Sequence, residues 1–280
     1  MKKATKAALF AVGTAALTVL TAAAVSEKPK VTSYVISTEK VKKPVRLLHV
    51  SDLHSSAYGK EQRKLIELTN AIAPDAILLT GDIADNRVPN DNAFAYTRAV
   101  GASYPCFYVT GNHEFYTGYA EELRQIFASH GLTLLEGESA TVATKGGNLT
   151  VCGVDDPYGF PDRKHRFWEE QLADCNAAVQ ADRFAVLLTH RPEIVDYYAE
   201  TDFDLIVAGH AHGGQVILPK VINGLYAPHQ GLIPKYAGGR YTLREGQTMI
   251  VSRGLSKYVR PRIFNRPELV VITLVPKNDP

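Results

Sequence analysis

The stretch LIVAGHAHGGQV, residues 205–216, decides how this chain folds and where its chemistry lies. The apolar run Leu205–Ala208 predicts a buried strand, which ends in Gly-His-Ala-His-Gly-Gly. Two imidazoles one residue apart can face one point only where the backbone turns sharply, and the flanking glycines permit that turn. Because imidazole is the commonest metal-ligating side chain, His210 and His212 predict a metal site at a strand end.

Four other predicted strands also end in candidate ligands. These are Asp52 and His54 after Val45–Val50, Asp82 after Ala76–Thr80, Asn112 and His113 after Cys106–Thr110, and His190 after Phe184–Thr189. In open α/β sheets the ligand crevice lies beyond the carboxyl ends of the strands. Five strands would therefore bring polar groups to one edge, and this convergence weighs more than any single motif.

Taken singly, each motif has a structural explanation, since Asp-x-His or Gly-Asp after a strand commonly forms a capped turn. A folded core would not place so many histidines and aspartates together without a metal to neutralise and bind them. Imidazole, carboxylate and amide donors without thiolate suit Mn, Fe, Zn or Ni rather than a structural zinc site. The donors are too numerous for one ion, and a carboxylate can bridge two.

Strands and helices alternate along the chain, which predicts an α/β sandwich. Predicted helices are Lys60–Ala73, Asn92–Val100, Tyr119–His130, Phe167–Val179 and Glu193–Ala199. Further predicted strands are Thr141–Thr144 and Leu149–Val154, which form a hairpin, and Thr248–Ser252 and Leu269–Val275. The hairpin favours a mixed sheet over an all-parallel one. Glu27–Pro44 is a polar linker with one expected edge strand, Val31–Ile36.

The chain has 280 residues, 45% hydrophobic and 21% charged, which is typical of a soluble globular protein. Its beginning differs: Lys2, Lys3 and Lys6 precede the uncharged run Ala7–Val25. That pattern predicts either a cleaved secretory signal or an uncleaved membrane anchor, and both place the rest outside the cytoplasm. The predicted division is 1–25 for the signal or anchor, 26–44 for the linker, and 45–280 for one catalytic domain.

The overall charge gives no reason to expect a nucleic-acid partner. The net charge is +2, and removing the three lysines of the leader leaves −1. Three cysteines are too few for a disulfide framework, although a single disulfide is left as an alternative. Cys106 and Cys152 are expected to pack as small hydrophobic side chains.

The ordered set Asp-x-His, Gly-Asp, Gly-Asn-His-Glu, His and Gly-His-x-His resembles the calcineurin-like metallophosphoesterases over Val45–Val275, nearly the whole mature chain. Finer motifs are similar to the exported bacterial phosphodiesterase branch of YkuE and YaeI. They are Thr189-His190-Arg191-Pro192, residues 210–215 with Leu218-Pro219, and Ser252-Arg253-Gly254-Leu255. That branch usually has threonine at the position of Ala211, which contributes no ligand. The resemblance implies a four-layer α-β-β-α sandwich with mixed sheets.

The resemblance also implies roles for individual residues. Asp52, His54 and His212 would bind a first divalent metal, Asp82 would bridge, and Asn112, His190 and His210 would bind a second, the metals being Mn, Fe, Zn or Mg. His113 would bind no metal and would face the substrate as the catalytic acid. Glu114 would orient His113 or support the ligands, and Asp85 would support the ligands or serve the structure.

The implied activity is hydrolysis of phosphodiesters by an exported enzyme, which we expect to be a monomer. Candidate substrates are cell-wall polymers, phospholipid head groups or nucleotide-sugar lipids. Residues 81–87, GDIADNR, depart from the Gly-Asp-x-x-Asp-Arg-Gly of the protein phosphatases, which argues against that branch. The alternatives are a phosphomonoesterase or nucleotidase on the same site, and a non-catalytic scaffold. Scaffolds lose ligands or the histidine at position 113, and this chain keeps them.

Two further groups have open interpretations. A basic cluster near the end is either an anion or membrane-surface patch or a solvated loop: Arg253, Lys257, Arg260, Arg262 and Arg266, with Tyr258 and Phe264 among them. Within it, Arg253 is expected to reach the crevice, because it follows a strand directly. Tyr158, Phe160 and Trp168 would form either an apolar lip for a lipid or glycan or ordinary helix packing.

Overall fold

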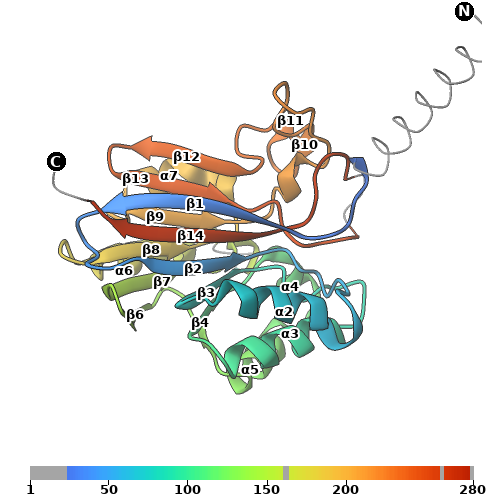
Figure 1. The fold of residues 1–280 in the computed structure, drawn as a ribbon, viewed down its shortest axis with the longest axis horizontal. Helices are drawn as coiled ribbons and strands as arrows, with labels where there is room; N and C mark the ends of the chain where they lie inside the picture. The colour runs from blue at the N-terminus through green and yellow to red at the C-terminus, as the bar shows by residue number, and fades with distance from the viewer. Residues whose placement is uncertain (1–23, 160–163, 259–261, 278–280) are drawn as a thin grey trace, which may run out of the picture.

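A computed structural model describes residues 24–159, 164–258 and 262–277, and these form two six-stranded sheets (Figure 1). In spatial order, the first sheet contains β1 (Lys30–Thr38), β14 (Glu268–Pro276), β2 (Val45–Val50), β3 (Ala76–Thr80), β4 (Cys106–Val109) and β5 (Leu132–Leu134). The second contains β12 (Gly239–Arg244), β13 (Gln247–Val251), β9 (Leu205–Ala208), β8 (Phe184–Leu188), β7 (Gly147–Gly153) and β6 (Ser139–Thr144). Both sheets mix parallel and antiparallel pairs, as predicted.

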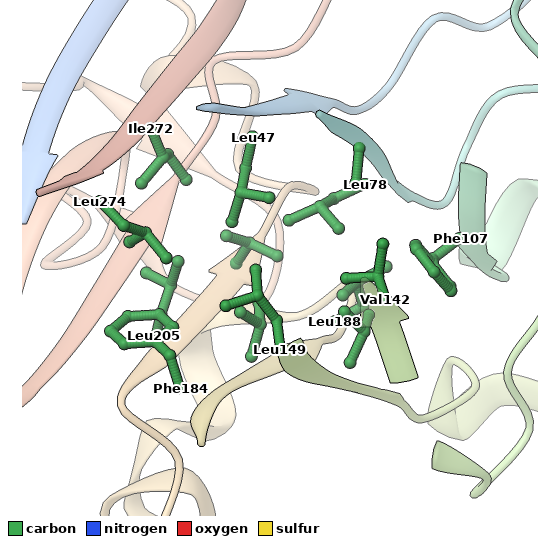
Figure 2. Packing of buried hydrophobic residues seen from close by; sticks show 14 of the residues in the cluster. Leu47, Leu78, Phe107, Val142, Leu149, Phe184, Leu188, Leu205, Ile272 and Leu274 are labelled. Atoms are coloured by element: carbon green, nitrogen blue, oxygen red, sulfur yellow. The ribbon is translucent and has the colours of Figure 1, made fainter. Parts of the chain in front are cut away.

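The core lies between the two sheets, where apolar side chains from facing strands interdigitate (Figure 2). Leu47 and Leu78 face inward from the first sheet, and Leu149 and Leu205 face them from the second. Strands buried on both faces read as continuous apolar runs. Alternate residues of the same strands, such as Leu48, therefore belong to a separate cluster on the outer face.

Helices cover both outer faces, which confirms the four-layer α-β-β-α sandwich. The first sheet is covered by α2 (Arg63–Ile72), α3 (Asp91–Gly101) and α5 (Ala120–Ser129), and the second by α6 (Lys164–Ala177) and α7 (Val195–Ala199). Leu65, Val100 and Phe127 anchor the first layer of helices, and Trp168 and Tyr198 anchor the second. Because β3, β4, β8 and β9 are buried along their whole length, the loops that follow them start from fixed positions.

The first and the last strand of the chain lie side by side. β1 is longer than the expected edge strand Val31–Ile36 and pairs in parallel with β14 over nine residues. Much of the predicted linker 26–44 is thus part of the first sheet, whereas the domain boundaries themselves stay predictions. The sequence did not predict β5, β12, or the small hairpin of β10 (Tyr226–Ala227) and β11 (Gly231–Leu232).

Three other expectations can be compared with the described residues. All three cysteines are buried and free, so no disulfide forms among them. Within residues 24–159, 164–258 and 262–277, no helix is long and apolar enough to cross a bilayer. Most of the leader (residues 1–23), Phe160 and Arg260 lie outside the described residues.

Candidate metal centre

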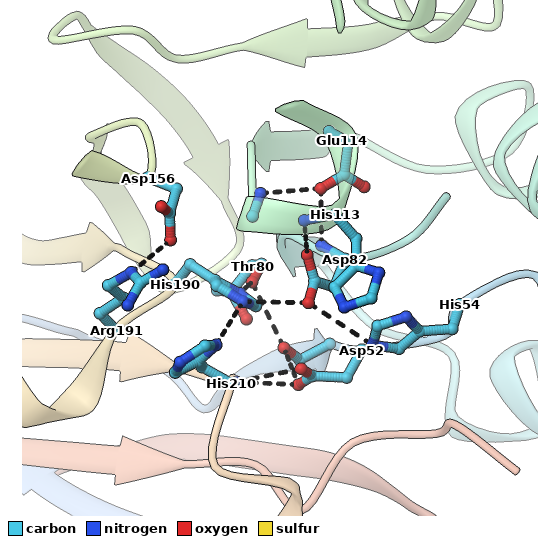
Figure 3. Close-up of polar contacts among 12 residues, drawn as sticks. Asp52, His54, Thr80, Asp82, His113, Glu114, Asp156, His190, Arg191 and His210 are labelled. Atoms are coloured by element: carbon cyan, nitrogen blue, oxygen red, sulfur yellow. Dashed lines mark hydrogen bonds and ion pairs between the residues drawn. The ribbon is translucent and has the colours of Figure 1, made fainter. Parts of the chain in front are cut away.

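The five strand ends meet at one edge of the sandwich, as the sequence predicted (Figure 3). Their loops hold the left-handed backbone conformation at five candidate ligands. The φ angles are 50° at Asp52, 46° at His54, 51° at Asp82, 64° at His210 and 47° at His212. Non-glycine residues rarely adopt this region, and such strain gathers at functional sites. The tight turns allow alternate residues of one loop to point at one centre.

The first donor group consists of Asp52, His54, Asp82 and His212, all buried, with ligand atoms within 4.8 Å of one another. His54 Nε2 lies 3.5 Å from Asp82 Oδ2, and His212 Nε2 lies 3.7 Å from Asp52 Oδ1. These separations exceed normal hydrogen-bond lengths. The group matches the predicted ligands of the first metal together with the predicted bridge.

The second donor group consists of Asp82, His190 and His210, so Asp82 is common to both groups. His190 Nδ1 lies 2.7 Å from the carbonyl oxygen of Thr80, to which it donates. This hydrogen bond leaves His190 Nε2 facing Asp82 Oδ2 at 3.2 Å and His210 Nδ1 at 3.2 Å. Asn112, predicted as the amide ligand, begins the short helix α4 (Asn112–Tyr116) after β4.

Several buried donor atoms at this edge have no hydrogen-bond partner. They are His54 Nε2, Asp82 Oδ2, Asn112 Oδ1, His210 Nε2 and His212 Nδ1. Unpaired polar atoms in an interior are costly unless a ligand satisfies them. Imidazole, carboxylate and amide donors without thiolate suit hard or borderline divalent cations. The residues therefore fit divalent metal ions, and Asp82 belongs to both donor groups.

The charges of the site are mutually dependent. Burial opposes ionisation of Asp82, but His190 and His54 lower the pKa of its carboxyl well below the usual range. Burial, followed by the neighbouring histidines, lowers the pKa of His210 and His212 well below 6.5. Both imidazoles are therefore neutral near pH 7, which is the form that binds metals.

His113 belongs to neither of these two donor groups, but it forms a third cluster with His54 and Asp85, whose donor atoms also lie within 4.8 Å of one another. Its backbone N–H donates to Asp82 Oδ1 at 2.8 Å, and its ring stands edge-on to His54 with 4.4 Å between ring centres. His113 Nδ1 lies 2.8 Å from Asn86 Oδ1 and 3.4 Å from Asp85 Oδ2. With Nδ1 held in this way, Nε2 is the nitrogen available to a substrate.

Asp85 supports two histidines, which resolves the two roles considered for it. Its Oδ2 lies 2.7 Å from His54 Nδ1 as well as 3.4 Å from His113 Nδ1. Burial would raise the pKa of Asp85, but hydrogen bonds with these two histidines lower it far below the usual range. The ionised carboxylate fixes the tautomer of His54 and directs its Nε2 toward the metal donors.

Glu114 supports the ligands and does not orient His113. Its buried carboxylate accepts backbone N–H groups of Asp82 at 2.9 Å, Ile83 at 2.8 Å, Ala84 at 3.0 Å and Gly111 at 2.8 Å. The loops after β3 and β4 are thereby tied together. Gly111 makes this approach feasible, since a Cβ there would overlap Asp82.

Arg253 does not reach the metal donors, contrary to our expectation. Its guanidinium donates to Asn223 Oδ1 at 2.6 Å and to the carbonyl oxygen of Asn223 at 3.3 Å. Arg262, another member of the basic cluster, donates to the carbonyl oxygens of Ser256 and Gly254. These two arginines make internal contacts, whereas the two interpretations of the cluster as a whole stay predictions.

Several residues near the site were not predicted. Asn86 contacts His113, as described above, and a buried ion pair joins Arg191 Nε to Asp156 Oδ2 at 2.7 Å. His229 stacks on His210 with ring centres 5.4 Å apart. Asp156 stands three residues after the end of β7, so the rule that revealed the other strand-end residues could have found it. His229 comes from an irregular loop and had no such signal.

A cavity of about 260 Å³ adjoins the second donor group. Its lining includes Tyr158, Arg191, Glu193, Tyr197 and His229. Trp168, one of the expected lip residues, also borders it but is only 1% exposed. Trp168 therefore mainly packs α6 against the second sheet, which is the structural alternative considered for it.

Comparison with known proteins agrees with this geometry. Residues 45–214 match the family described as Calcineurin-like phosphoesterase. The chain is 29% identical to an uncharacterized metallophosphoesterase of Campylobacter jejuni, over 88% of this chain and 63% of that relative. It is 28% identical to the uncharacterized protein YpbG of Bacillus subtilis, over 96% of both chains.

Solved structures share the fold at low sequence identity. The phosphopantetheinyl hydrolase PptH of Mycobacterium tuberculosis has a TM-score of 0.52 at 14% identity, over 80% of this chain and 95% of that one. A dimetal phosphatase from Danio rerio has a TM-score of 0.50 at 14% identity, over 75% and 88% of the two chains. Since the family match extends over more than half of the sequence, this protein belongs to the calcineurin-like metallophosphoesterases.

Proposed function

We infer that the protein hydrolyses phosphodiester bonds with two divalent cations. The observation that supports this most is the pair of donor groups that share the buried Asp82 and leave ligand atoms unpaired. When bound, such cations polarise phosphoryl oxygens and make water a nucleophile near neutral pH. Asp52, His54 and His212 would hold one ion, Asn112, His190 and His210 the other, and Asp82 both.

His113 would act as the catalytic acid. A proton on its Nε2 can be given to the leaving oxygen, because Asn86 and Asp85 hold the opposite nitrogen, Nδ1. Glu114 holds the loops of Asp82 and Gly111 together, so the position of His113 beside the donor groups stays fixed.

The charges near the site favour a diester over a monoester. A monoester dianion carries one more negative charge, which enzymes commonly bind with an arginine. Arg191 is the buried arginine that lines the adjoining cavity, and its charge is already paired with Asp156 at 2.7 Å and Glu193 at 3.2 Å. The monoanionic phosphate of a diester needs no further cation, so we favour this class.

We place the enzyme outside the cytoplasm, either free after cleavage or anchored through its leader, as in the exported branch that the motifs resemble. The basic start and the uncharged run Ala7–Val25 support this localisation. Phosphodiesters of the cell envelope, from lipids or wall polymers, are then the substrates at hand. The enzyme would work as a monomer. The near-neutral charge of the mature chain gives no reason to expect a nucleic-acid partner.

The decisive experiment compares a bis-aryl phosphodiester with the matching aryl monoester. The full chain is stripped of metal and then supplied with Mn, Zn, Fe or Mg in turn. We expect metal-dependent turnover that is faster on the diester, and its loss in Asp82→Asn; Asp91→Asn, an exposed aspartate of α3, is the matched control. Faster monoester turnover would establish the phosphatase alternative. Binding of two ions without any turnover would establish the scaffold.

A further inference from the structure

An exposed apolar surface lies on the loop that follows His212. Its most exposed side chains are Val221 at 79%, Leu232 at 74% and Ile233 at 68%. Leu218, Leu225 and Tyr226 add side chains that are 41–45% exposed. We call these six residues the apolar tip. Large apolar side chains concentrated in one exposed loop mark a surface that contacts another body.

The apolar tip is attached directly to the metal centre. Leu225 N–H donates to the carbonyl oxygen of Gly214 at 2.8 Å, and Ile233 N–H donates to that of Leu225 at 2.8 Å. Gly214 stands two residues after the ligand His212. On the inner side of the same loop, His229 stacks on His210. Whatever contacts the apolar tip therefore lies next to the metal centre.

The chain enters the domain beside the base of this loop. Phe264 N–H donates to the carbonyl oxygen of Ala24 at 2.7 Å, and Ile217 N–H donates to that of Ile263 at 2.9 Å. Figure 1 shows β10 and β11 at the end of the molecule where the chain enters β1, opposite the C-terminus. The uncharged run Ala7–Val25 therefore joins the domain on the side of the apolar tip.

The charge of the loop has one sign. Residues 210–244 contain no aspartate or glutamate, and Lys220 and Lys235 are exposed within the loop that bears the apolar tip. Apolar side chains flanked by lysines suit the interface of an anionic membrane, where the ammonium groups meet lipid phosphates. A second copy of this chain would offer the same positive charge and would be repelled.

We propose that the apolar tip inserts into the headgroup region of an anionic lipid bilayer, with Lys220 and Lys235 against lipid phosphates. The metal centre then opens at the bilayer surface, beside the point where the leader joins the domain. If the bilayer also supplies the phosphodiester substrate, that part rests on the proposed function. The docking of the apolar tip does not rest on it.

The docking is tested with an environment-sensitive fluorophore on Leu232→Cys in the full chain. The label is selective because Cys106, Cys152 and Cys175 are all buried. Val35→Cys on β1, at a residue that is 55% exposed, is the matched control. The chain is reconstituted in vesicles of phosphatidylglycerol and phosphatidylethanolamine that carry a lipid-borne quencher, and in vesicles of phosphatidylcholine.

We expect a blue shift and quenching at position 232 in the anionic vesicles, weaker effects in phosphatidylcholine, and a water-like signal at position 35. Lys220→Glu with Lys235→Glu should reduce the effect at position 232. A water-like signal at position 232 in a chain that is held by its leader would overturn the proposal. A blue shift at position 232 that grows with protein concentration in the absence of lipid would also overturn the proposal. It would identify a second copy of the chain as the occupant of the apolar tip.

A second measurement separates docking from catalysis. Leu232→Ser with Ile233→Ser should lower turnover of a vesicle-borne diester by about tenfold, from the apolar area removed. Turnover of a soluble bis-aryl diester should stay unchanged, since neither residue is a metal donor. An equal loss on both substrates would contradict a docking role. Absence of all turnover in the parent chain would refute the proposed function and leave the fluorescence result standing.

Discussion

His54 and Asp85 form a buried pair in which Nδ1 lies 2.7 Å from Oδ2. The pair sets which nitrogen of His54 faces the other metal donors. Asp85 therefore orients a metal ligand without being a ligand itself. Removing such a partner commonly weakens metal affinity about 10- to 100-fold. We expect Asp85→Asn to weaken, by the same factor, the binding of whichever ion dissociates more readily from the parent. Calorimetry with Mn²⁺ measures this affinity. The exposed Asp91→Asn should bind like the parent, and unaltered affinity in Asp85→Asn would refute the positioning role.

Replacement of His113 should separate chemistry from metal binding. His113→Ala should lower kcat by about 10²–10⁴-fold, the usual contribution of a positioned acid. The loss should be larger for an alkyl leaving group than for nitrophenol, because nitrophenolate needs no proton to depart. Metal content, measured by atomic emission, should stay at two ions per chain. His130→Ala removes a histidine that bonds Thr97 on the outer helices and serves as the control; equal turnover in the two variants would exclude our assignment.

Glu114→Gln should destabilise the fold without removing a metal ligand. The amide that replaces one carboxylate oxygen would confront backbone N–H donors, which leaves buried groups unsatisfied at about 1–3 kcal/mol. Chemical unfolding followed by circular dichroism measures this loss. Glu122→Gln, on the exposed first turn of α5, should unfold like the parent. A Glu114→Gln variant as stable as the parent would show that the four N–H contacts do not need the charge.

The stability of the protein should fall as the pH drops below 6.5, partly because of His49. Burial lowers the pKa of this imidazole to about 3, and its Nε2 lies 2.7 Å from Thr80 Oγ1. Between these two pH values the unfolded chain binds a proton that the folded chain refuses, so the contribution is complete above pH 6.5 and is lost toward pH 3. The slope from this one group is at most about 1.4 kcal/mol per pH unit.

Denaturant midpoints at pH 7.5, 6.5 and 5.5 measure that dependence. His49→Gln should unfold at lower denaturant at pH 7.5 and should show a shallower fall toward pH 5.5. An identical slope in the variant and the parent would mean that other groups cause the acid sensitivity.

The positions of the metal donors could be predicted because each follows a strand, and strand ends meet at one edge by geometry. Strands β2, β3, β8 and β9 could be predicted because each is an apolar run between turns. The short strand β5 and the alternating β12 gave weaker periodic signals, so they were missed. The pairing of β1 with β14 joins residues more than 200 positions apart, and no local sequence pattern encodes such a contact.

Side-chain partners were harder to predict than positions. The sequence placed Glu114 next to His113 and left two roles open for it, orienting that ring or supporting the ligands. The structure turns the carboxylate toward four backbone N–H groups of neighbouring loops. The expectation for Arg253 was wrong, since Asn223 and Gly238 offer it acceptors that come from a distant loop. Hydrogen-bond choices of this kind depend on loop geometry, which sequence patterns describe poorly.

The parallel pairing of β1 with β14 dictates when folding can finish. The first sheet obtains its strand next to β2 from Glu268–Pro276, more than 200 residues further along the chain, and β1 must wait for it. Until Glu268–Pro276 arrives, β1 has no neighbour and β2 presents an open edge, a state prone to aggregation. Closing contacts across such a separation is slow. The first sheet should therefore be complete only after Glu268–Pro276 has been synthesised, and a version cut at Val45 should leave β14 as an unprotected edge.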